Sequence, residues 1–412
     1  MLTIVPARAP RPSRAAAAGK LAIALAGGGP LGAFYELGAL HALGEALAGR
    51  ELTAFDVYVG VSSGSLVASG LANGFDTTTL GSTFVQDRST SMPFSPGALL
   101  RPATAEYLGR LARVPRVLTD IARQFARDPL RAQWAAAVAA LGRLVPAALL
   151  DNSGLERFLH GAFTAPGHTD DFRRLPGRLY VVATDLDTGA SVAFGEPRHA
   201  RVPISRAVAA SAALPGLYPP VTIDGRHYVD GALIRTVHAS LALEAGCTLV
   251  LCINPLVPFD ASRASGAGRR RLAEGGLPVI LGQTFRALIH SRMQVGMAAY
   301  RTRFPHADIL LLEPDRHDET LFFSNVFRYS GRRRLTEHAY QHTRRDLLGA
   351  GSALRTVLAR HGLSLDLERL RDPRRRFTTA AHERELEVRH VARRLERSLD
   401  SIERALAGET AG

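Results

Sequence analysis

Two short apolar runs near the N-terminus, each ending in glycine and each followed by a helical pattern, constrain the fold most strongly. Residues 21–25 are predicted to form a buried strand, and residues 33–47 keep helical spacing directly after Gly32. Residues 55–61 predict a second strand, and residues 65–71 open a second helix. This strand–helix–strand–helix order within about fifty residues indicates an α/β fold built on parallel strands.

The length and composition fit one large core, or one core with a helical appendage. Of the 412 residues, 46% are hydrophobic and 22% are charged, as is typical of a globular protein. The best candidate for a membrane span, residues 134–150, is interrupted by Arg143 and Pro146, so no span is predicted. Further strands are predicted at residues 179–184, 191–194, 226–229 and 248–253.

The net charge of +13 at pH 7 is carried almost entirely by arginine, since Lys20 is the only lysine. A surface of this kind suits anionic lipid headgroups or nucleic acid, or is simply solvated. No zinc-finger spacing and no aromatic RNA-binding motif accompanies the arginines, so nucleic acid is not expected as a partner.

The only two cysteines, Cys247 and Cys252, are predicted to lie in one strand. An offset of five residues places them on opposite faces of that strand, about 16 Å apart, which is too far for a disulfide. A cytoplasmic location is therefore expected, with peripheral attachment to a membrane as a variant.

A glycine-rich turn, GGGPLG at residues 27–32, separates the first predicted strand from the first helix. Consecutive glycines bring backbone N–H groups close to a ligand, and the helix N-terminus adds a positive field, so the turn suits a phosphate or an oxyanion. Gly27, Gly29 and Gly32 also satisfy the dinucleotide pattern G-x-G-x-x-G. That function needs an acidic residue at the end of the second strand, whereas Asp56 lies near its start.

The second strand runs instead into GVSSG at residues 60–64. A serine on a sharp turn between a strand and a helix is a nucleophile elbow, and Gly60 and Gly64 avoid clashes of side chains with the neighbouring backbone. Ser62 is therefore the predicted nucleophile.

The serine needs a base, and two kinds of residue are candidates. His227 and His238 are the histidines nearest to Asp230, which closes a short predicted strand just before Gly231. A carboxylate at the C-terminal end of a strand lies where sites form in α/β sheets, although Asp-Gly is also an ordinary turn.

Taken together, these segments resemble the patatin-like phospholipases. The turn at residues 27–32 resembles the oxyanion loop of that family, GVSSG resembles its nucleophile elbow, and DGA at residues 230–232 resembles its Asp-Gly-Gly/Ala motif. ASAALPGLYPP at residues 210–220 and the segment 183–194 also fit, so the resemblance covers roughly residues 20–255 in the order of the family.

The resemblance implies a three-layer α/β/α sandwich around a mostly parallel sheet. It also implies that Ser62 attacks the substrate, that Asp230 itself acts as the base, and that hydrolysis proceeds through an acyl-enzyme without a metal or other cofactor. The implied oxyanion hole consists of the backbone around Gly27, Gly28 and Gly29, and the supporting motif glycines are Gly32, Gly60, Gly64 and Gly231. One departure is Leu31, where the family usually has Arg or Lys, and it concerns the substrate more than the chemistry.

The predicted domain organisation follows from these assignments. Residues 1–19 are expected to be a disordered basic tail, and residues 20–315 the acyl hydrolase domain, with a helical cap inserted at about residues 87–150. Residues 316–412 are expected to be a helical, Arg-rich extension. Within it, residues 384–406 have the pattern of an amphipathic helix, which either binds an anionic membrane, joins another copy of the chain, or packs on its own core.

The expected function is a lipid acyl hydrolase of the phospholipase A or esterase type. The alternative is a patatin-like domain that acts mainly as a membrane- or protein-binding regulatory module with weak turnover. A nucleotide-binding protein would rest on the glycine turn alone.

Overall fold

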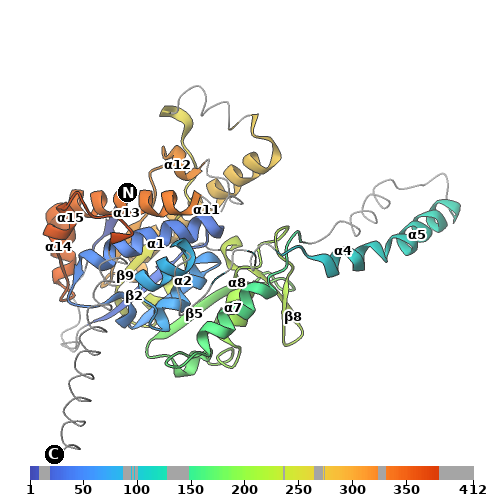
Figure 1. The fold of residues 1–412 in the computed structure, drawn as a ribbon, viewed down its shortest axis with the longest axis horizontal. Helices are drawn as coiled ribbons and strands as arrows, with labels where there is room; N and C mark the ends of the chain where they lie inside the picture. The colour runs from blue at the N-terminus through green and yellow to red at the C-terminus, as the bar shows by residue number, and fades with distance from the viewer. Residues whose placement is uncertain are drawn as a thin grey trace, which may run out of the picture.

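The structure is a computed structural model (Figure 1). It describes residues 1–8, 19–86, 101–127, 148–234, 237–263, 274–322 and 331–379, together with residues 94, 97 and 272.

A nine-stranded mixed sheet forms the centre of the molecule. In spatial order its strands are β1 (Leu2–Val5), β10 (Asp308–Leu312), β9 (Cys247–Ile253), β2 (Lys20–Leu25), β4 (Val57–Val61), β5 (Arg178–Asp185), β8 (Arg226–Asp230) and β7 (Val221–Ile223), and β6 (Ser191–Phe194) pairs with β5. The strands β10, β9, β2, β4 and β5 are parallel to one another, whereas β1, β6 and β8 run antiparallel to their neighbours. The expected α/β sheet is therefore confirmed, with a parallel centre and antiparallel margins.

Helices cover both faces of the sheet, as a three-layer sandwich requires. The α-helices of at least five residues in the described ranges are α1 (Gly29–Ala46), α2 (Ser63–Ala72), α3 (Thr77–Gly81), α4 (Thr104–Leu111), α5 (Val114–Arg127), α7 (Ser153–Phe163), α8 (Ile204–Ser211), α9 (Ala239–Glu244), α11 (Gly276–Arg303), α13 (Arg332–Gly349), α14 (Gly351–Ala359) and α15 (Leu367–Arg371). Because side chains alternate along a strand, Leu21, Ile23 and Leu25 of β2 point to one face of the sheet. They belong to the core that also contains side chains of α1, α2, α8 and α13. Ala22 and Ala24 point to the other face of the sheet, which α9 and α11 cover.

The C-terminal region packs into the same core as the rest of the chain. α13 lies along α1, and the two backbones approach so closely that a Cβ on Gly38 would lie 2.4 Å from the carbonyl oxygen of Thr336. Leu335, Tyr340 and Leu354 are buried in the core that also contains α1. The described part of the extension beyond residue 315 is mainly helical, as expected, and shares one hydrophobic core with the sheet. It also contains the short strand β11 (Ser364–Leu365), which pairs with β3 (Leu47–Ala48).

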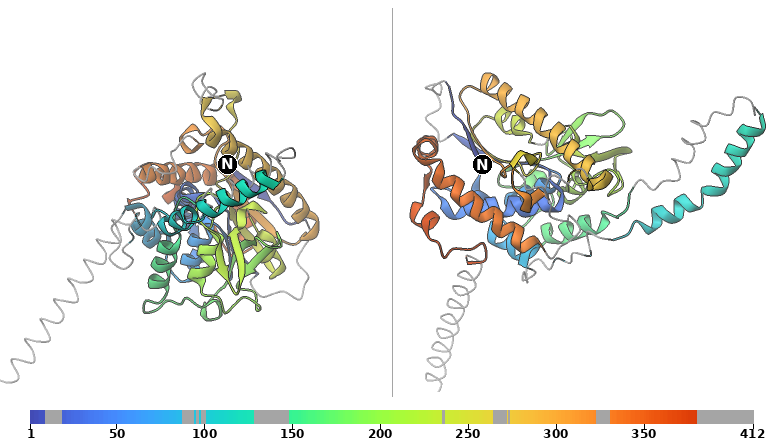
Figure 2. Two further views of the ribbon diagram at one scale, coloured as in Figure 1. Left: turned by 90° about the vertical axis from the view of Figure 1, so that its right-hand side faces the viewer. Right: turned by 90° about the horizontal axis from the view of Figure 1, so that it is seen from above.

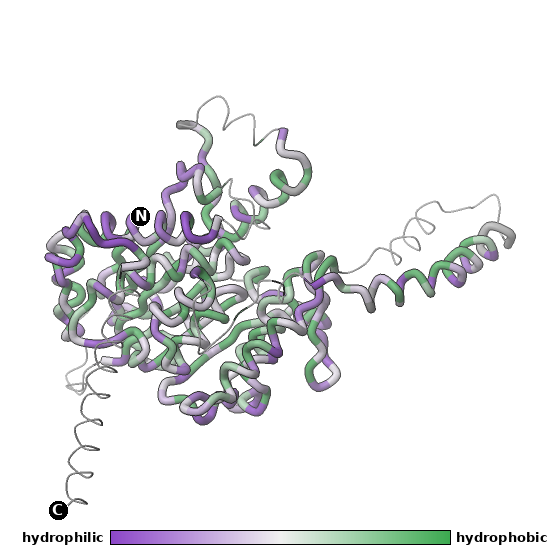
Figure 3. The backbone as a smooth tube through the Cα atoms, in the orientation of Figure 1, coloured by the Kyte–Doolittle hydropathy of each residue, from purple (hydrophilic) through white to green (hydrophobic). Residues whose placement is uncertain are grey.

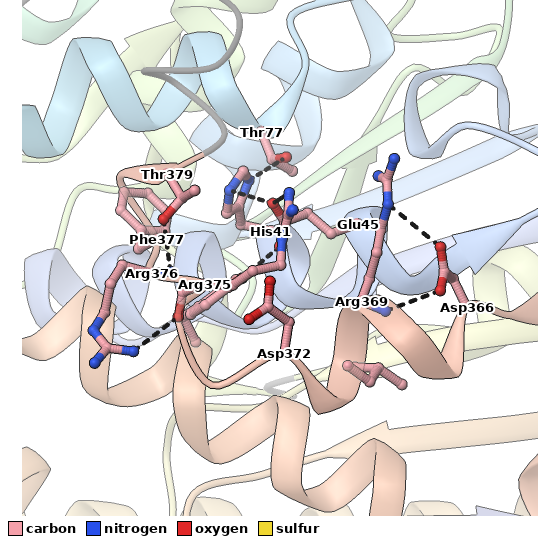
Figure 4. A network of polar contacts seen from close by, with 12 residues as sticks. His41, Glu45, Thr77, Asp366, Arg369, Asp372, Arg375, Arg376, Phe377 and Thr379 are labelled. Carbon is pink, nitrogen blue, oxygen red and sulfur yellow. Dashed lines mark hydrogen bonds and ion pairs between the residues drawn. The ribbon is translucent and has the colours of Figure 1, made fainter.

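Polar contacts hold the last described segment against α1 (Figure 4). The guanidinium of Arg375 forms an ion pair with Glu45 at 3.0 Å, and both side chains are nearly buried. The ring of Phe377 packs edge-on against His41, whose Nδ1 lies 3.0 Å from the hydroxyl of Thr77. The chain is therefore anchored to the core as far as residue 377. The predicted amphipathic helix at residues 384–406 lies outside the described residues.

The assignment of residues 1–19 to a disordered tail is wrong for Leu2–Val5. This segment is the edge strand β1, which pairs with β10 in antiparallel register from Leu2 opposite Leu312 to Val5 opposite Ile309. An apolar edge strand becomes ordered because β10 offers it a full set of backbone partners. Residues 9–18 of the predicted tail lie outside the described part of the chain.

The predicted placement of the two cysteines is also corrected. The sheet register slips between Lys20 and Leu21, opposite Cys247 and Leu249, so that β9 carries a bulge. The bulge inserts one residue, and Cys247 and Cys252 therefore pack on the same face of the sheet instead of opposite faces. Both are free, buried thiols.

The helices α4 and α5 form an arm that projects from the body, as seen in two views (Figures 1 and 2). Hydrophobic and hydrophilic residues alternate along it (Figure 3). The base of the arm is held by hydrogen bonds of 2.8 Å from the N–H of Leu150 to the carbonyl of Leu217 and from the N–H of Asp151 to the carbonyl of Arg101. The cap predicted at about residues 87–150 includes this arm and also residues outside the described ranges, so it stays a prediction. No helix in the described ranges has the length and apolar character needed to cross a membrane.

Candidate active site

The sheet brings Ser62 and Asp230 together across β5. Ser62 follows Val61, the last residue of β4, which lies opposite Val182 of β5. On the other side of β5, Asp230 lies opposite Ala183. Val182 and Ala183 are adjacent on β5, so this strand brings Ser62 and Asp230 together although they are 168 positions apart in the sequence. β8 is antiparallel to β5, so the location of Asp230 follows from this register and not from the parallel-strand rule used in the sequence analysis.

Ser62 has the backbone conformation of a strained elbow. Its φ of 53° and ψ of −125° are unusual for a residue with a side chain, and the helix α2 begins immediately after it. A Cβ on Gly60 would lie 2.4 Å from the Cα of Ser65, and one on Gly64 would lie 2.4 Å from the carbonyl oxygen of Ala26. The two glycines of the predicted motif are therefore required by close packing of the turn.

The hydroxyl of Ser62 donates a hydrogen bond of 2.5 Å to Oδ2 of Asp230. Both side chains are buried, with 5% and 2% of their surfaces exposed. The other carboxylate oxygen, Oδ1, accepts the backbone N–H of Ala232 at 2.8 Å. Each oxygen of Asp230 thus has one partner, which fixes the orientation of the carboxylate toward Ser62.

Burial raises the pKa of Asp230 to about 6, since the charged form loses its hydration. The hydrogen bonds from Ser62 and from the N–H of Ala232 act in the opposite direction and limit the rise. Asp230 is therefore ionised at neutral pH and is a stronger base than an exposed aspartate.

The glycine turn lies directly against Ser62. A Cβ on Gly27 would lie 3.0 Å from the Cβ of Ser62 and 2.8 Å from that of Ala232, so a side chain there would block the space above the hydroxyl. α1 begins at Gly29, which has a φ of +60°, and no side chain among the described residues caps this helix. Within the described part of the chain, the N–H groups of Gly28 and Gly29 donate to no protein acceptor, so the start of α1 offers free donors beside Ser62.

Gly231 and Gly32 also lie where a side chain would clash with the residues around the site. A Cβ on Gly231 would lie 2.2 Å from the carbonyl oxygen of Val182. One on Gly32 would lie 3.0 Å from Cγ of Pro255 and 3.2 Å from Oγ of Ser63. All of the glycines singled out in the sequence are thus gathered around the one pair of Ser62 and Asp230.

Three supporting residues were missed in the sequence analysis. The hydroxyl of Ser211 accepts the N–H of Ser62 at 2.8 Å and donates to the carbonyl of Val182 at 2.5 Å, which ties the elbow to β5. The hydroxyl of Thr184 donates to the backbone carbonyl of Asp230 at 3.0 Å, and the N–H of Asp230 donates to the carbonyl of Ala213. Ser211 and Ala213 both lie in the segment that resembles the family, so that segment holds the two catalytic candidates in place.

The two candidate histidines are not bonded to Ser62 or Asp230 in the described structure. His227 is exposed on β8, where Nδ1 lies 3.6 Å from the carboxylate of Asp187. His238 is the residue directly before α9. Within the described ranges, neither is a hydrogen-bond partner of Ser62 or Asp230. These ranges also contain no group of three or more His, Cys, Asp or Glu residues arranged to hold a metal ion.

A strand–serine–helix elbow whose hydroxyl bonds to a buried carboxylate is an arrangement that suits a serine hydrolase of the α/β class. Residues 23–243, more than half of the chain, match the Patatin family model, described as patatin-like phospholipase. The chain therefore belongs to the patatin-like phospholipase family.

Two solved structures were also similar. VipD from Legionella pneumophila is 16% identical with a TM-score of 0.31, and the alignment covers 62% of this chain and 54% of VipD. The type III effector protein ExoU is 16% identical with a TM-score of 0.27, and the alignment covers 82% of this chain and 62% of ExoU. The chain thus spans less than two thirds of the length of either structure.

Proposed function

We propose that this protein hydrolyses fatty acyl esters of lipids, as a phospholipase A or esterase, with Ser62 as nucleophile and Asp230 as the general base. The observation that carries the proposal is the 2.5 Å hydrogen bond between the Ser62 hydroxyl and a buried carboxylate. Membership of the patatin-like phospholipase family supports the lipid substrate.

In the first half of the reaction, Oγ of Ser62 attacks the carbonyl carbon of the ester while Oδ2 of Asp230 takes the hydroxyl proton. The carbonyl oxygen becomes an oxyanion that accepts hydrogen bonds from the backbone around Gly27, Gly28 and Gly29, where the positive end of α1 adds to its stabilisation. The intermediate then collapses, and the protonated Asp230 gives its proton to the departing alcohol. Ser62 is left as an acyl ester.

In the second half, a water molecule attacks the acyl-enzyme. Asp230 takes a proton from the water, the same backbone donors stabilise the second oxyanion, and the proton returns to Oγ of Ser62 as the fatty acid leaves. The raised pKa of Asp230 suits this alternation, since a base with a pKa of about 6 is ionised at neutral pH and still gives its proton back.

Labelling with a fluorophosphonate probe tests the proposal. We expect a single labelled residue, Ser62, identified by mass spectrometry of the labelled protein. The matched controls are Ser63→Ala, because the Ser63 hydroxyl is buried within one residue of Ser62, and Ser65→Ala, because its hydroxyl donates to the carbonyl of Ser62. Both controls should still be labelled, and labelling that survives Ser62→Ala would refute the assignment. A folded wild-type protein that takes no label and hydrolyses no ester would favour the regulatory-module alternative.

A further inference from the structure

One face of α11 is apolar and exposed. Its large side chains there are between 43% and 70% exposed: Leu277, Ile280, Leu281, Phe285, Leu288 and Val295. Apart from the adjacent pair Ile280 and Leu281, successive members lie three, four or seven positions apart, so they share one side of the helix. A contiguous apolar patch of this kind usually marks an interaction surface.

The opposite face of α11 is fixed to the body, so the apolar face does not turn inward. The side-chain amide of Gln283 accepts the N–H of Phe259 at 3.1 Å and donates to its carbonyl at 2.7 Å. Met293, Met297 and Tyr300 of α11 are buried against the same face of the sheet that α9 covers. In Figure 2, α11 runs along one side of the body, and its N-terminal end lies on the same side as the base of the arm.

The exposed face adjoins the candidate active site. Nη1 of Arg292 lies 3.5 Å from the carbonyl oxygen of Leu233, three residues after Asp230. Leu233 and Leu214 are themselves exposed, by 38% and 39%, and Leu214 follows Ala213, the residue whose carbonyl accepts the N–H of Asp230.

A second connection runs to the oxyanion loop. Phe259, which Gln283 holds against α11, belongs to the segment that follows β9 and contains Pro255. The ring of Pro255 is so close to the glycine turn that a Cβ on Gly28 would lie 2.6 Å from it. α11 is therefore connected to both sides of the site: its body-facing side reaches the oxyanion loop through Phe259, and Arg292 on its exposed side reaches the loop after Asp230.

The charge of α11 indicates what covers this face. The helix contains four arginines and no acidic residue, within a chain of net charge +13. Arg303 pairs with Glu244 at 2.9 Å and Arg286 stacks over the ring of Phe322, whereas Arg292 and Arg301 are exposed. A lipid layer with anionic headgroups offers an apolar interior for the leucines and negative charge for the arginines. A second copy of the chain would instead bring another acid-free arginine helix against the first, and like charges repel.

We propose that the exposed face of α11 docks the protein on anionic lipid surfaces, beside the mouth of the Ser62 site. The proposal deepens the proposed function and rests on it for the identity of the substrate. A lipid drawn from the layer would then reach Ser62 while the protein stays bound, with no need to cross water.

Co-sedimentation with vesicles tests docking separately from chemistry. The full chain with Ser62→Ala is used for binding, because it cannot consume the vesicles through the proposed nucleophile. We expect it to bind phosphatidylglycerol vesicles more tightly than phosphatidylcholine vesicles, and binding should weaken as salt is added. The combined variant Leu281→Ser, Phe285→Ser and Leu288→Ser should lose at least about tenfold in vesicle affinity.

The matched control changes Leu108, Leu111 and Leu118 to serine, since these leucines of the arm are equally exposed. It should keep its vesicle affinity. With Ser62 intact, the α11 variant should hydrolyse a soluble short-chain ester at a rate within about twofold of the unmodified chain, since the substituted side chains face away from the core.

Undiminished vesicle binding by the α11 variant, or a loss of vesicle binding in the arm variant alone, would overturn the proposal. So would an unmodified chain that dimerises through α11, detected as a dimer that the α11 variant converts to a monomer. Absence of ester hydrolysis in every variant would count against the proposed function and leave the docking result intact.

Discussion

At the scale of single residues, the environment of Asp230 supports its proposed role as the base. Its carboxylate is buried and accepts only the Ser62 hydroxyl and the N–H of Ala232 among the described residues. That Ser62 and Asp230 would lie together was predictable from motifs, whereas the residues that hold them in place were not. Ser211 and Thr184 reach the site through side-chain hydrogen bonds that depend on the sheet register, and a register cannot be read from isolated segments.

The raised pKa of Asp230 predicts a definite dependence of activity on pH. Because the base must be ionised to take the Ser62 proton, kcat/KM on a soluble ester should be constant above a pH of about 6 and should fall about tenfold per pH unit below it. A profile of kcat/KM against pH measures this directly. A profile that stays flat down to pH 4 would contradict a buried carboxylate base.

The same shift predicts a cost in stability at neutral pH. The folded pKa of Asp230 is above its unfolded value, so its favourable contribution is complete below the unfolded pKa of 3.8 and is lost as the pH rises through about 6. A shift of roughly two pKa units corresponds to about 3 kcal/mol. Asp230→Asn, which carries no charge, should therefore be at least as stable as the unmodified chain at pH 8 in urea unfolding.

At the scale of elements, the motif-bearing strands and helices were the most predictable, because apolar runs and glycine turns mark them locally. The strands β1, β7 and β10 were not predicted. β7 belongs to a hairpin whose turn residues Asp224 and Gly225 have φ values of 50° and 77°, the conformation of a tight two-residue hairpin turn. The bulge in β9 reversed the predicted faces of the cysteines, since a single inserted residue inverts an alternating pattern.

The packing of α13 on α1 gives a prediction with a matched control. In Gly38→Ala, the added methyl group would meet the Thr336 carbonyl at 2.4 Å, so the two helices must separate at a cost of about 1–3 kcal/mol. Gly161→Ala, in α7, adds the same group where no atom of the described residues lies within 4 Å, and it should be neutral or stabilising by up to about 1 kcal/mol. Chemical denaturation compares the two. Equal effects would show that α13 does not pack on α1 as described.

At the scale of the whole molecule, the chain combines one sheet-centred core with an arm whose base lies next to the loop that holds Asp230. The bridge between Ala148 and Gly216 and the hydrogen bond between Leu150 and Leu217 tie the arm to the segment that follows Ala213. The sequence pattern indicated an inserted helical segment at this place. It could not indicate how the helices are directed, because amphipathic helices reveal an apolar face but not its partner.

If residues 87–150 enclose long acyl chains, replacing α4 and α5 by a short linker between Arg101 and Leu150 should change the preference for chain length. We expect hydrolysis of long-chain esters to fall much more than hydrolysis of a two- to four-carbon ester. A series of nitrophenyl esters of increasing length measures this. Equal loss at every length would show that the arm is needed for the core and not for enclosing the substrate.

The central claim, a Ser62–Asp230 dyad without histidine, is tested most directly by kcat/KM of Asp230→Asn beside His227→Ala and His238→Ala on one soluble ester at pH 8. Asparagine keeps the size of aspartate but cannot take the proton, so we expect a loss of about 10²–10⁴-fold in Asp230→Asn. Each histidine variant should stay within a few-fold of the unmodified chain, because neither histidine is a hydrogen-bond partner of the pair in the described structure. A histidine variant that is folded and as inactive as Asp230→Asn would contradict the dyad and require a triad in its place.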